Sequence, residues 1–306
     1  MSSPTEGRTA PRLRRRTAAS WLLVLPALAI IGLFMLAPLG LMFEVSFLEK
    51  GAQGGVRWGT FTPEAYVAFV FERDLDDSLL LNLDYVRIFA RSFVLAFATM
   101  TIALLIGFPV ALHMALQTQA RRNLLIFLVT IPFWTNLLVR NYAWILFLRN
   151  NGLLDGVLHA LGLTDAPIGI LYTPTAVMIG LVYSYLPFMV LPIYASLEKL
   201  DFRLVEAAYD LGANRWRALW RVIVPLATPG IAAGCILVLI PCLGAYVTPE
   251  LLGGSRSLMI GNLISGQFGQ ARNWPLGAAF AFVLLTVVLI AMVAYLVRFR
   301  QPPETA

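Results

Sequence analysis

Six apolar blocks, each long enough to cross a lipid bilayer, divide this sequence of 306 residues. The hydrocarbon core of a bilayer is roughly 30 Å thick, and about 20 helical residues cross it. Because no water is present there to satisfy an open backbone, each block is predicted to be an α-helix. Charged residues make up 13% of the chain, about half the share in a soluble domain. The predicted spans are residues 21–43, 88–113, 124–148, 174–196, 225–248 and 276–298.

Basic residues predict how the spans are oriented. With a cytoplasmic N-terminus, the segments on the cytoplasmic side hold roughly twice as many Lys and Arg residues as the outer segments. Both termini are therefore expected to be cytoplasmic, with a basic tail over residues 1–20 and a short tail over residues 299–306 on either side of one membrane domain over residues 21–298. The net charge of +6 then reflects membrane topology and requires no nucleic-acid partner.

The segment 197–224, between the fourth and fifth spans, is strongly patterned. Asp201 is suited to cap a helix of about three turns, and Gly212 is suited to end that helix because glycine adopts the left-handed conformation freely. Asn214 can cap a second helix that runs toward Pro225. The pattern predicts a helix–turn–helix elbow on the cytoplasmic face. Such an elbow can transmit a movement of another protein to the two spans that it connects.

This elbow resembles the cytoplasmic-loop signature of permease subunits in bacterial ABC importers. The signature is Glu-Ala-Ala, three residues, Gly, nine residues and an aliphatic-x-aliphatic-Pro motif; here its last part is Val222-Ile223-Val224-Pro225, with Val where Ile and Leu are usual. The resemblance implies an all-α membrane protein with six transmembrane helices and the type I ABC importer permease fold. It also implies that a partner ATPase is contacted by Glu206, Ala207, Ala208, Gly212 and Pro225.

Further motifs narrow the resemblance to the first permease of spermidine/putrescine importers. They cover most of residues 80–300 and include Asn82-Leu83-Asp84-Tyr85, Pro132-Phe133-Trp134-Thr135 and Met259-Ile260-Gly261-Asn262. The resemblance implies import of a polyamine such as spermidine or putrescine across the bacterial inner membrane. It implies as partners two ATPase subunits, a second homologous permease and a periplasmic solute-binding protein.

Two other functions remain as alternatives. The same machine can carry another small organic or anionic solute, and an arginine within a span suits an anion. A stand-alone secondary transporter is a different class, but ion-coupled carriers place ionisable acids in the membrane, and the predicted spans contain no Asp or Glu.

Polar and aromatic residues in or beside the spans are candidates for the translocation path. Arg140 lies within the third predicted span, where an arginine costs roughly 2.5–3.5 kcal/mol and requires protein or water beside it. Asn136 and Trp144 are predicted to share its helical face. Arg140 suits a wall of the path and a contact between neighbouring helices equally well. The other candidates are Trp134, Tyr183, Tyr185, Tyr246 and Glu250.

The motifs of ATPases and hydrolases are absent from the sequence. Neither Lys50 nor Lys199 follows a glycine, so no phosphate-binding GxxxxGK[ST] loop is present. His113 and His159 belong to no HExxH motif. The chain is therefore expected to be a non-catalytic subunit without a cofactor or a metal, with ATP hydrolysis in another polypeptide.

Overall fold

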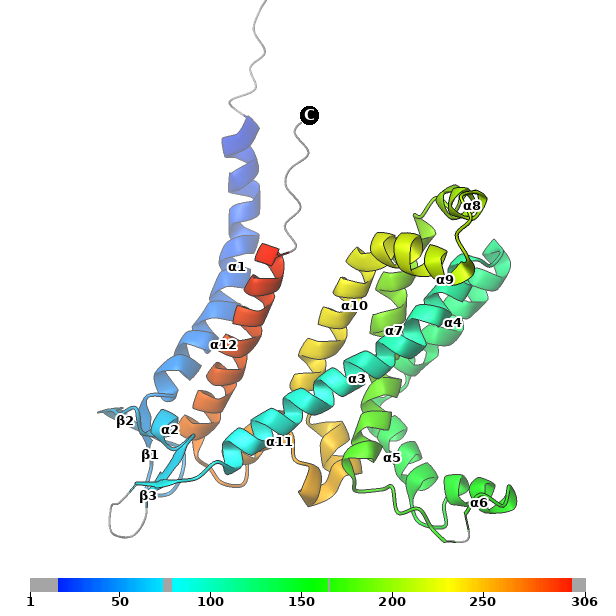
Figure 1. Cartoon of the computed structure of the whole chain (residues 1–306). Helices are drawn as coiled ribbons and strands as arrows, with labels where there is room; N and C mark the ends of the chain where they lie inside the picture. The colour runs from blue at the N-terminus through cyan, green and yellow to red at the C-terminus, as the bar shows by residue number, and fades with distance from the viewer. Residues whose placement is uncertain (1–15, 74–78, 165, 299–306) are drawn as a thin grey trace, which may run out of the picture.

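Long helices form almost all of the structure, a computed structural model that describes residues 16–73, 79–164 and 166–298 (Figure 1). The tail predicted at 299–306 and the first 15 residues of the tail predicted at 1–20 lie outside these described residues. The long helices are α1 (Arg16–Val45), α3 (Asp84–Ala115), α4 (Gln119–Trp134), α5 (Leu137–Leu148), α7 (Pro174–Glu198), α10 (Val224–Leu243) and α12 (Trp274–Arg298).

Shorter elements connect the long helices. The short α-helices are α2 (Glu64–Val67), α6 (Leu153–Ala160), α8 (Arg203–Asp210), α9 (Arg215–Ala218) and α11 (Ile260–Phe268). Two π-helical turns, η1 (Leu219–Ile223) and η2 (Pro249–Gly253), and one 3-10 turn, η3 (Gly254–Ser257), complete the helical elements. Two antiparallel hairpins, β1 (Leu48–Lys50) with β2 (Val56–Phe61) and β3 (Phe71–Arg73) with β4 (Leu79–Leu81), lie in the segment after α1, where no strand was predicted.

The prediction of an α-helical membrane protein is confirmed. Among the described residues, five helices are long and apolar enough to cross a membrane, and a sixth span follows if α4 and its bent continuation are counted together. The five are Val24–Val45, Asp84–Ala115, Pro174–Glu198, Arg215–Leu243 and Trp274–Ala294.

The third predicted span is broken, whereas one continuous helix was expected over residues 124–148. Helix α4 ends at Trp134, and the next helices turn away from it by 92°. The cause is local, because Thr135 is extended and the Asn136 side chain accepts a hydrogen bond from the backbone N–H of Leu138 at 2.8 Å. Asn136 is therefore a cap at the break and does not lie within a continuous helical face with Arg140.

The fifth predicted span is shifted toward the N-terminus. Helix α10 ends at Leu243, so it does not extend over residues 244–248 of the predicted span 225–248. At its other end α10 continues without interruption from α9 and η1, and together they form one helix from Arg215. Pro225 lacks an N–H and its ring crowds the preceding turn, which accounts for the π-helical bend just before it.

The centre of the bundle is formed by α3, α7 and α10, which pack closely on one another. Glycine makes the closest approach possible: a Cβ atom on Gly230 of α10 would lie 2.5 Å from the backbone oxygen of Pro192 on α7. Gly234, one turn further along α10, faces Met189 of α7 in the same way. Small residues one turn apart are a common means of bringing membrane helices together.

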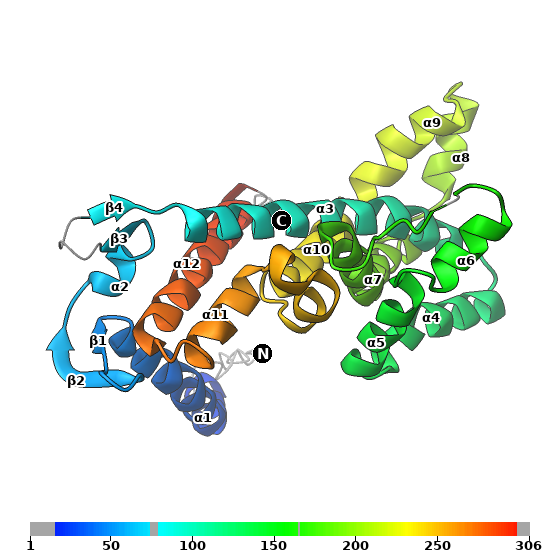
Figure 2. The ribbon, with the colours of Figure 1, turned by 90° about the horizontal axis from the view of Figure 1, so that it is seen from below.

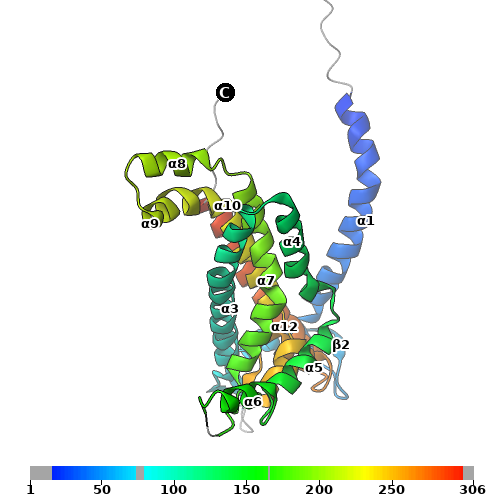
Figure 3. The same cartoon turned by 90° about the vertical axis from the view of Figure 1, so that its right-hand side faces the viewer.

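The two ends of the bundle differ in character. One end, here called the elbow end, carries α8 and α9 together with the first described turn of α1 and the last turn of α12 (Figures 1 and 3). The opposite end, the hairpin end, carries strands β1–β4 and helices α2 and α6 (Figure 1). Figure 2 shows that the hairpins, α1 and α12 lie on one side of the molecule and α4, α5 and α6 on the other.

Candidate functional site: an exposed elbow and a membrane cavity

The elbow between α7 and α10 has the turn and the second cap that its sequence predicts, but the first cap is displaced by one residue. Phe202 is the N-cap of α8, and Asp201, just before it, accepts a hydrogen bond from the Arg203 N–H at 3.0 Å. Gly212 follows α8 with a φ of +83°, in the left-handed region. The Asn214 side chain accepts from the Arg217 N–H at 2.8 Å and caps α9. The polypeptide therefore folds back sharply at Gly212, between α8 and α9.

One side of the elbow is fixed to the bundle and the other is open. Val205 of α8 is buried in an apolar cluster with Met114 of α3 and Leu197 of α7. Glu206 and Ala207 are exposed, and Leu211, just before the turn, is 90% exposed.

A hollow of about 580 Å³ lies between the elbow and the end of α3. Leu112 and Leu116 of α3 form one wall, and Glu206, Tyr209 and Trp216 of the elbow form part of the other. Of the predicted coupling residues, Glu206 borders this hollow. Ala208, two residues further along α8, is half-buried. Pro225 is exposed at the start of α10, beyond the bend.

A second cavity, of about 480 Å³, lies at the break between α4 and α5. Its walls come from three regions that are distant in sequence: the break with the start of α5, the middle of α7, and the end of α10 with the segment that follows it. Three of the predicted path residues line it, Arg140, Tyr185 and Tyr246, and they are joined by Phe133 and Phe188. Ser184, Thr248 and these two phenylalanines were not predicted as site residues.

Arg140 crosses the break and contacts the end of α4. Its Nη1 donates a hydrogen bond to the backbone oxygen of Pro132 at 3.0 Å, and the Thr135 hydroxyl donates to the same oxygen at 2.8 Å. This carbonyl belongs to the last turn of α4, where no helical N–H follows to satisfy it. A cation near a helix C-terminus is also favoured by the helix dipole. Arg140 thus lines the cavity and stabilises the break at the same time.

Tyr185 makes a comparable contact on the opposite wall. Its hydroxyl donates a hydrogen bond to the backbone oxygen of Pro241, in the last turn of α10, at 3.2 Å. The cavity is therefore bordered by the C-terminal ends of two helices, α4 and α10. Each end carries a partial negative charge of roughly −0.5, so the two ends together offset the positive charge that Arg140 brings to the same lining, which contains no carboxylate.

The other predicted path residues lie outside this lining. Trp134 is 80% exposed at the end of α4 and touches Phe133 edge-on. Tyr183 packs edge-on against Trp144, with ring centroids 5.5 Å apart. Asn136 caps α5, as described above.

Glu250 is held by a buried amide that the sequence did not single out as a site residue. Asn262 of α11 is 6% exposed, and its Nδ2 donates to Glu250 Oε2 at 2.7 Å and to the Tyr246 backbone oxygen at 2.9 Å. Because one amide holds both, the backbone at Tyr246 is fixed relative to Glu250. Buried polar side chains are normally hydrogen-bonded, but the partners of Asn262 become known only from the folded structure.

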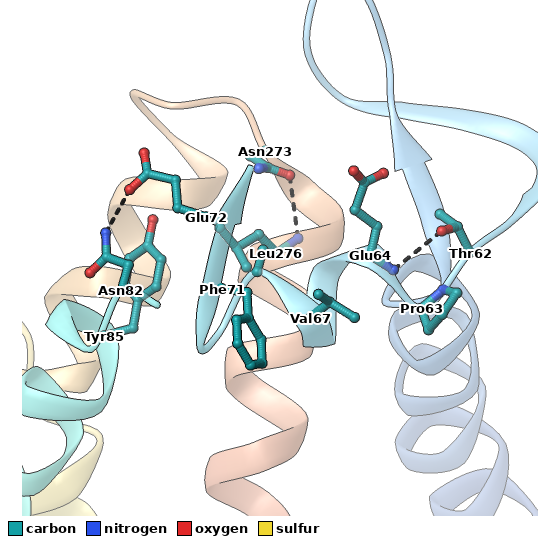
Figure 4. A pocket seen from close by; sticks show the side chains of 11 residues that line it. Thr62, Pro63, Glu64, Val67, Phe71, Glu72, Asn82, Tyr85, Asn273 and Leu276 are labelled. Carbon is teal, nitrogen blue, oxygen red and sulfur yellow. Dashed lines mark hydrogen bonds between the residues drawn. The ribbon is translucent and has the colours of Figure 1, made fainter. Parts of the chain in front are cut away.

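A further pocket, of about 470 Å³, opens at the hairpin end between α2, β3 and the starts of α3 and α12 (Figure 4). Glu72 accepts a hydrogen bond from Asn82 Nδ2 at 2.7 Å on one side of it, and Glu64 lies on the opposite side. Phe71 and Tyr85 contribute aromatic surface. Within the described residues no group of three or more His, Cys, Asp or Glu side chains is arranged to hold a metal ion.

A helical membrane bundle with an exposed, capped elbow at one end and a cavity bordered by broken helices defines a membrane transport subunit. The chain belongs to the family of binding-protein-dependent transport system inner membrane components, whose model matches residues 91–302. It is accordingly a permease subunit of a bacterial ABC importer, located in the inner membrane.

Curated relatives carry the similarity over most of their length. The chain is 42% identical over 241 residues to the spermidine/putrescine transport system permease protein PotB of Escherichia coli K12, covering 79% of this chain and 87% of that protein. It is 42% identical over 262 residues to PotB of Haemophilus influenzae, covering 86% and 87%. The inner membrane ABC transporter permease protein YdcU of Escherichia coli K12 is 33% identical over 283 residues, again covering 86% and 87%.

Solved structures support the fold. A bacterial ABC transporter involved in the import of the acidic polysaccharide alginate matches 95% of this chain and 100% of its own chain, with a TM-score of 0.70 and 18% identity. The same kind of transporter in complex with an alginate pentasaccharide-bound periplasmic protein matches with a TM-score of 0.71 and 17% identity. At this level of identity the match concerns the fold alone.

Proposed function

We propose that this permease subunit imports a polyamine such as spermidine or putrescine into the cytoplasm. The observation that carries the proposal is the 42% identity to PotB proteins over most of both chains. The cavity at the α4–α5 break is compatible with this solute, because helix C-termini and aromatic rings from Phe133, Tyr185, Phe188 and Tyr246 border it. Aromatic faces and partial negative charges both attract alkylammonium groups.

Arg140 favours a second candidate, the import of an anionic solute by the same machine. It is the charged residue among the side chains that line the cavity. Its guanidinium, however, is already bound to the Pro132 carbonyl, which lowers the attraction left for a solute anion. Competition experiments separate the two candidates: radiolabelled putrescine uptake by the complete system should be inhibited by excess spermidine and unaffected by excess sulfate. The reverse result would favour the anion.

The elbow is the proposed contact with the ATPase. Glu206, Ala207, Ala208 and Gly212 lie on α8 and its turn, and the open side of that turn is exposed. Orientation follows from the proposal: the elbow end faces the cytoplasm, so the ends of α1 and α12 face it as well (Figure 1). The complete importer would contain two ATPase subunits, a second homologous permease and a periplasmic solute-binding protein. The chain itself would be non-catalytic and would transmit the motion.

Substitution at the elbow tests this assignment. Glu206→Lys reverses a charge on the exposed side of α8 and should abolish both uptake and co-purification of the ATPase. The matched control is Glu44→Lys, which reverses an exposed acid in the last turn of α1, shortly before β1, and should leave both intact. Retention of the ATPase by the Glu206 variant, or uptake of polyamine by this chain alone in liposomes, would contradict the proposal.

A further inference from the structure

The outward side of α9 and η1 carries aromatic and basic residues in two stripes. Trp216 and Trp220 are one helical turn apart, as are Arg217 and Arg221, so each pair lies along one side of the helix. Trp216 is 69% and Trp220 64% exposed, and both arginines are exposed as well. Ala218, on the opposite side, is buried. We call these two tryptophans and two arginines the Trp/Arg surface.

The arginines of the Trp/Arg surface differ from Arg122 in their ionic contacts. Within the part of the chain that the structure describes, Arg217 and Arg221 form no ion pair. By contrast, Arg122, at the start of α4, pairs with Glu198 at the end of α7 at 3.0 Å. Two exposed guanidinium groups beside two open indole rings are suited to an anionic and partly apolar partner.

The length of α10 predicts that the Trp/Arg surface lies at the depth of lipid headgroups. The 20 residues of α10 are about 30 Å long, which equals the thickness of the hydrocarbon core. Residues 215–223 continue the same helix beyond that thickness. The π-helical bend before Pro225 turns α9 across the end of α10, and α8 lies farther from the spans than α9 does (Figures 1 and 3). The bend therefore keeps α9 close to the membrane surface.

We propose that the Trp/Arg surface binds anionic phospholipid headgroups of the leaflet at the elbow end. Arg217 and Arg221 hold phosphate oxygens in forked hydrogen bonds, and Trp216 and Trp220 lie at the headgroup level, where indole rings are enriched because they are amphipathic. The lipid contact steadies the second helix of the elbow. Only the naming of that leaflet as cytoplasmic rests on the proposed function; the binding itself does not.

The test uses the full chain in bilayers of stated composition. The purified protein is placed in nanodiscs of phosphatidylcholine with a minor share of spin-labelled phosphatidylglycerol or spin-labelled phosphatidylcholine. Electron paramagnetic resonance then gives the affinity for the anionic lipid relative to the neutral one. In Arg217→Gln/Arg221→Gln this relative affinity should fall roughly fivefold for each arginine lost. Arg217→Lys/Arg221→Lys keeps the charge and should retain most of it.

Controls make each outcome decisive. Arg203→Gln removes an exposed arginine of α8 and should leave the relative affinity unchanged. Lipids brominated next to the headgroup should quench fluorescence in the wild type more than in Trp216→Phe/Trp220→Phe. Unchanged lipid selectivity in the double glutamine variant, or an equal loss in the Arg203 variant, overturns the proposal. It is also overturned if these tryptophans respond to an added ATPase subunit and not to bromolipid, since the surface would then bind protein.

Discussion

The elbow and the third apolar block present opposite relations between sequence and structure. In the elbow, Gly212 and Asn214 occupy the turn and cap positions that the sequence predicts, and Asp201 lies one residue before the N-cap predicted for it. In the third block, an apolar run predicted one helix and the structure has two, separated at Thr135 and Asn136. Both regions contain an Asn cap, yet only the cap in polar surroundings was recognised from the sequence.

The difference shows how average hydropathy hides a local stop signal. Asn136 caps α5 and Asn214 caps α9, each accepting a backbone N–H at 2.8 Å, from two residues on in the first case and three residues on in the second. In the elbow a glycine lies shortly before the cap and two arginines follow it, so the cap stands out. In the third block a run of apolar residues on both sides favours a span in any long window, and the cap is averaged away. A Thr-Asn pair inside an apolar run should therefore be treated as a helix-cap signal when spans are predicted from the sequence.

The largest effect is expected from Arg140→Ala, which tests whether the break depends on its side chain. Loss of the hydrogen bond to the Pro132 carbonyl should lower the free energy of unfolding by about 2 kcal/mol, the usual scale for a bond to a charged group. Denaturant titration in detergent micelles measures this change. An unaltered stability with altered solute selectivity would instead identify Arg140 as a wall of the path alone.

Gly212→Val should disturb the elbow through the backbone alone. A left-handed conformation costs a residue with a Cβ about 1–2 kcal/mol, and no heavy atom lies within 4 Å of the position that a Cβ would occupy. The penalty is therefore torsional and should appear as faster hydrogen exchange in α8. Gly212→Asn is the control, since asparagine tolerates this region better. Equal exchange in the wild type and the valine variant would show that the turn is not fixed.

Asn214→Ala and Asn136→Ala form a matched pair across the two regions. Each removes one capping hydrogen bond and should cost about 1 kcal/mol. Asn214→Ala should raise hydrogen exchange in α9, and Asn136→Ala should raise it in α5 while leaving α9 unchanged. Aspartate at position 214 should restore the cap. If Asn136→Ala had no effect on α5, the break would depend on Thr135 and Arg140 instead of the cap.

The smallest effect is expected at the entrance to the elbow. Asp201→Ala removes one hydrogen bond to the Arg203 N–H on an exposed surface and should cost about 0.5 kcal/mol. Circular dichroism melts of the purified protein give the change in stability, and Asp201→Ser, which retains an acceptor, serves as the control. A loss as large as that of Gly212→Val would mean that Asp201 has a contact beyond the start of α8.

Much of the fold was predictable because lipid imposes simple rules. The lengths of the apolar blocks predicted five spans to within a few residues at most ends. Gly212 and Asn214 predicted the turn and the second helix of the elbow. The two hairpins were missed because strands such as Leu48–Lys50 and Phe71–Arg73 have only three residues and little alternation. The end of α10 at Leu243 was missed because Gly244 lies inside a run of apolar residues.

The cavity was only partly predictable, since its residues come together across long distances in sequence. Arg140 was found because a charge within an apolar block is conspicuous. Tyr185 and Tyr246 were proposed as aromatic wall residues, and the structure places both in the lining. Asn262 was not proposed, because its significance comes from contacts to Tyr246 and Glu250 that only folding creates.

The break in the third apolar block also shortens the helix that crosses the hydrocarbon layer at this place. A rod of 16 residues, the length of α4, measures about 24 Å, which is shorter than the roughly 30 Å of hydrocarbon around it. Non-helical backbone at such a depth is tolerated only beside protein or water, and the adjoining cavity provides that shelter. Helix α4 therefore covers only part of the hydrocarbon thickness in this block, and the cavity adjoins the break at Thr135 where the helix stops.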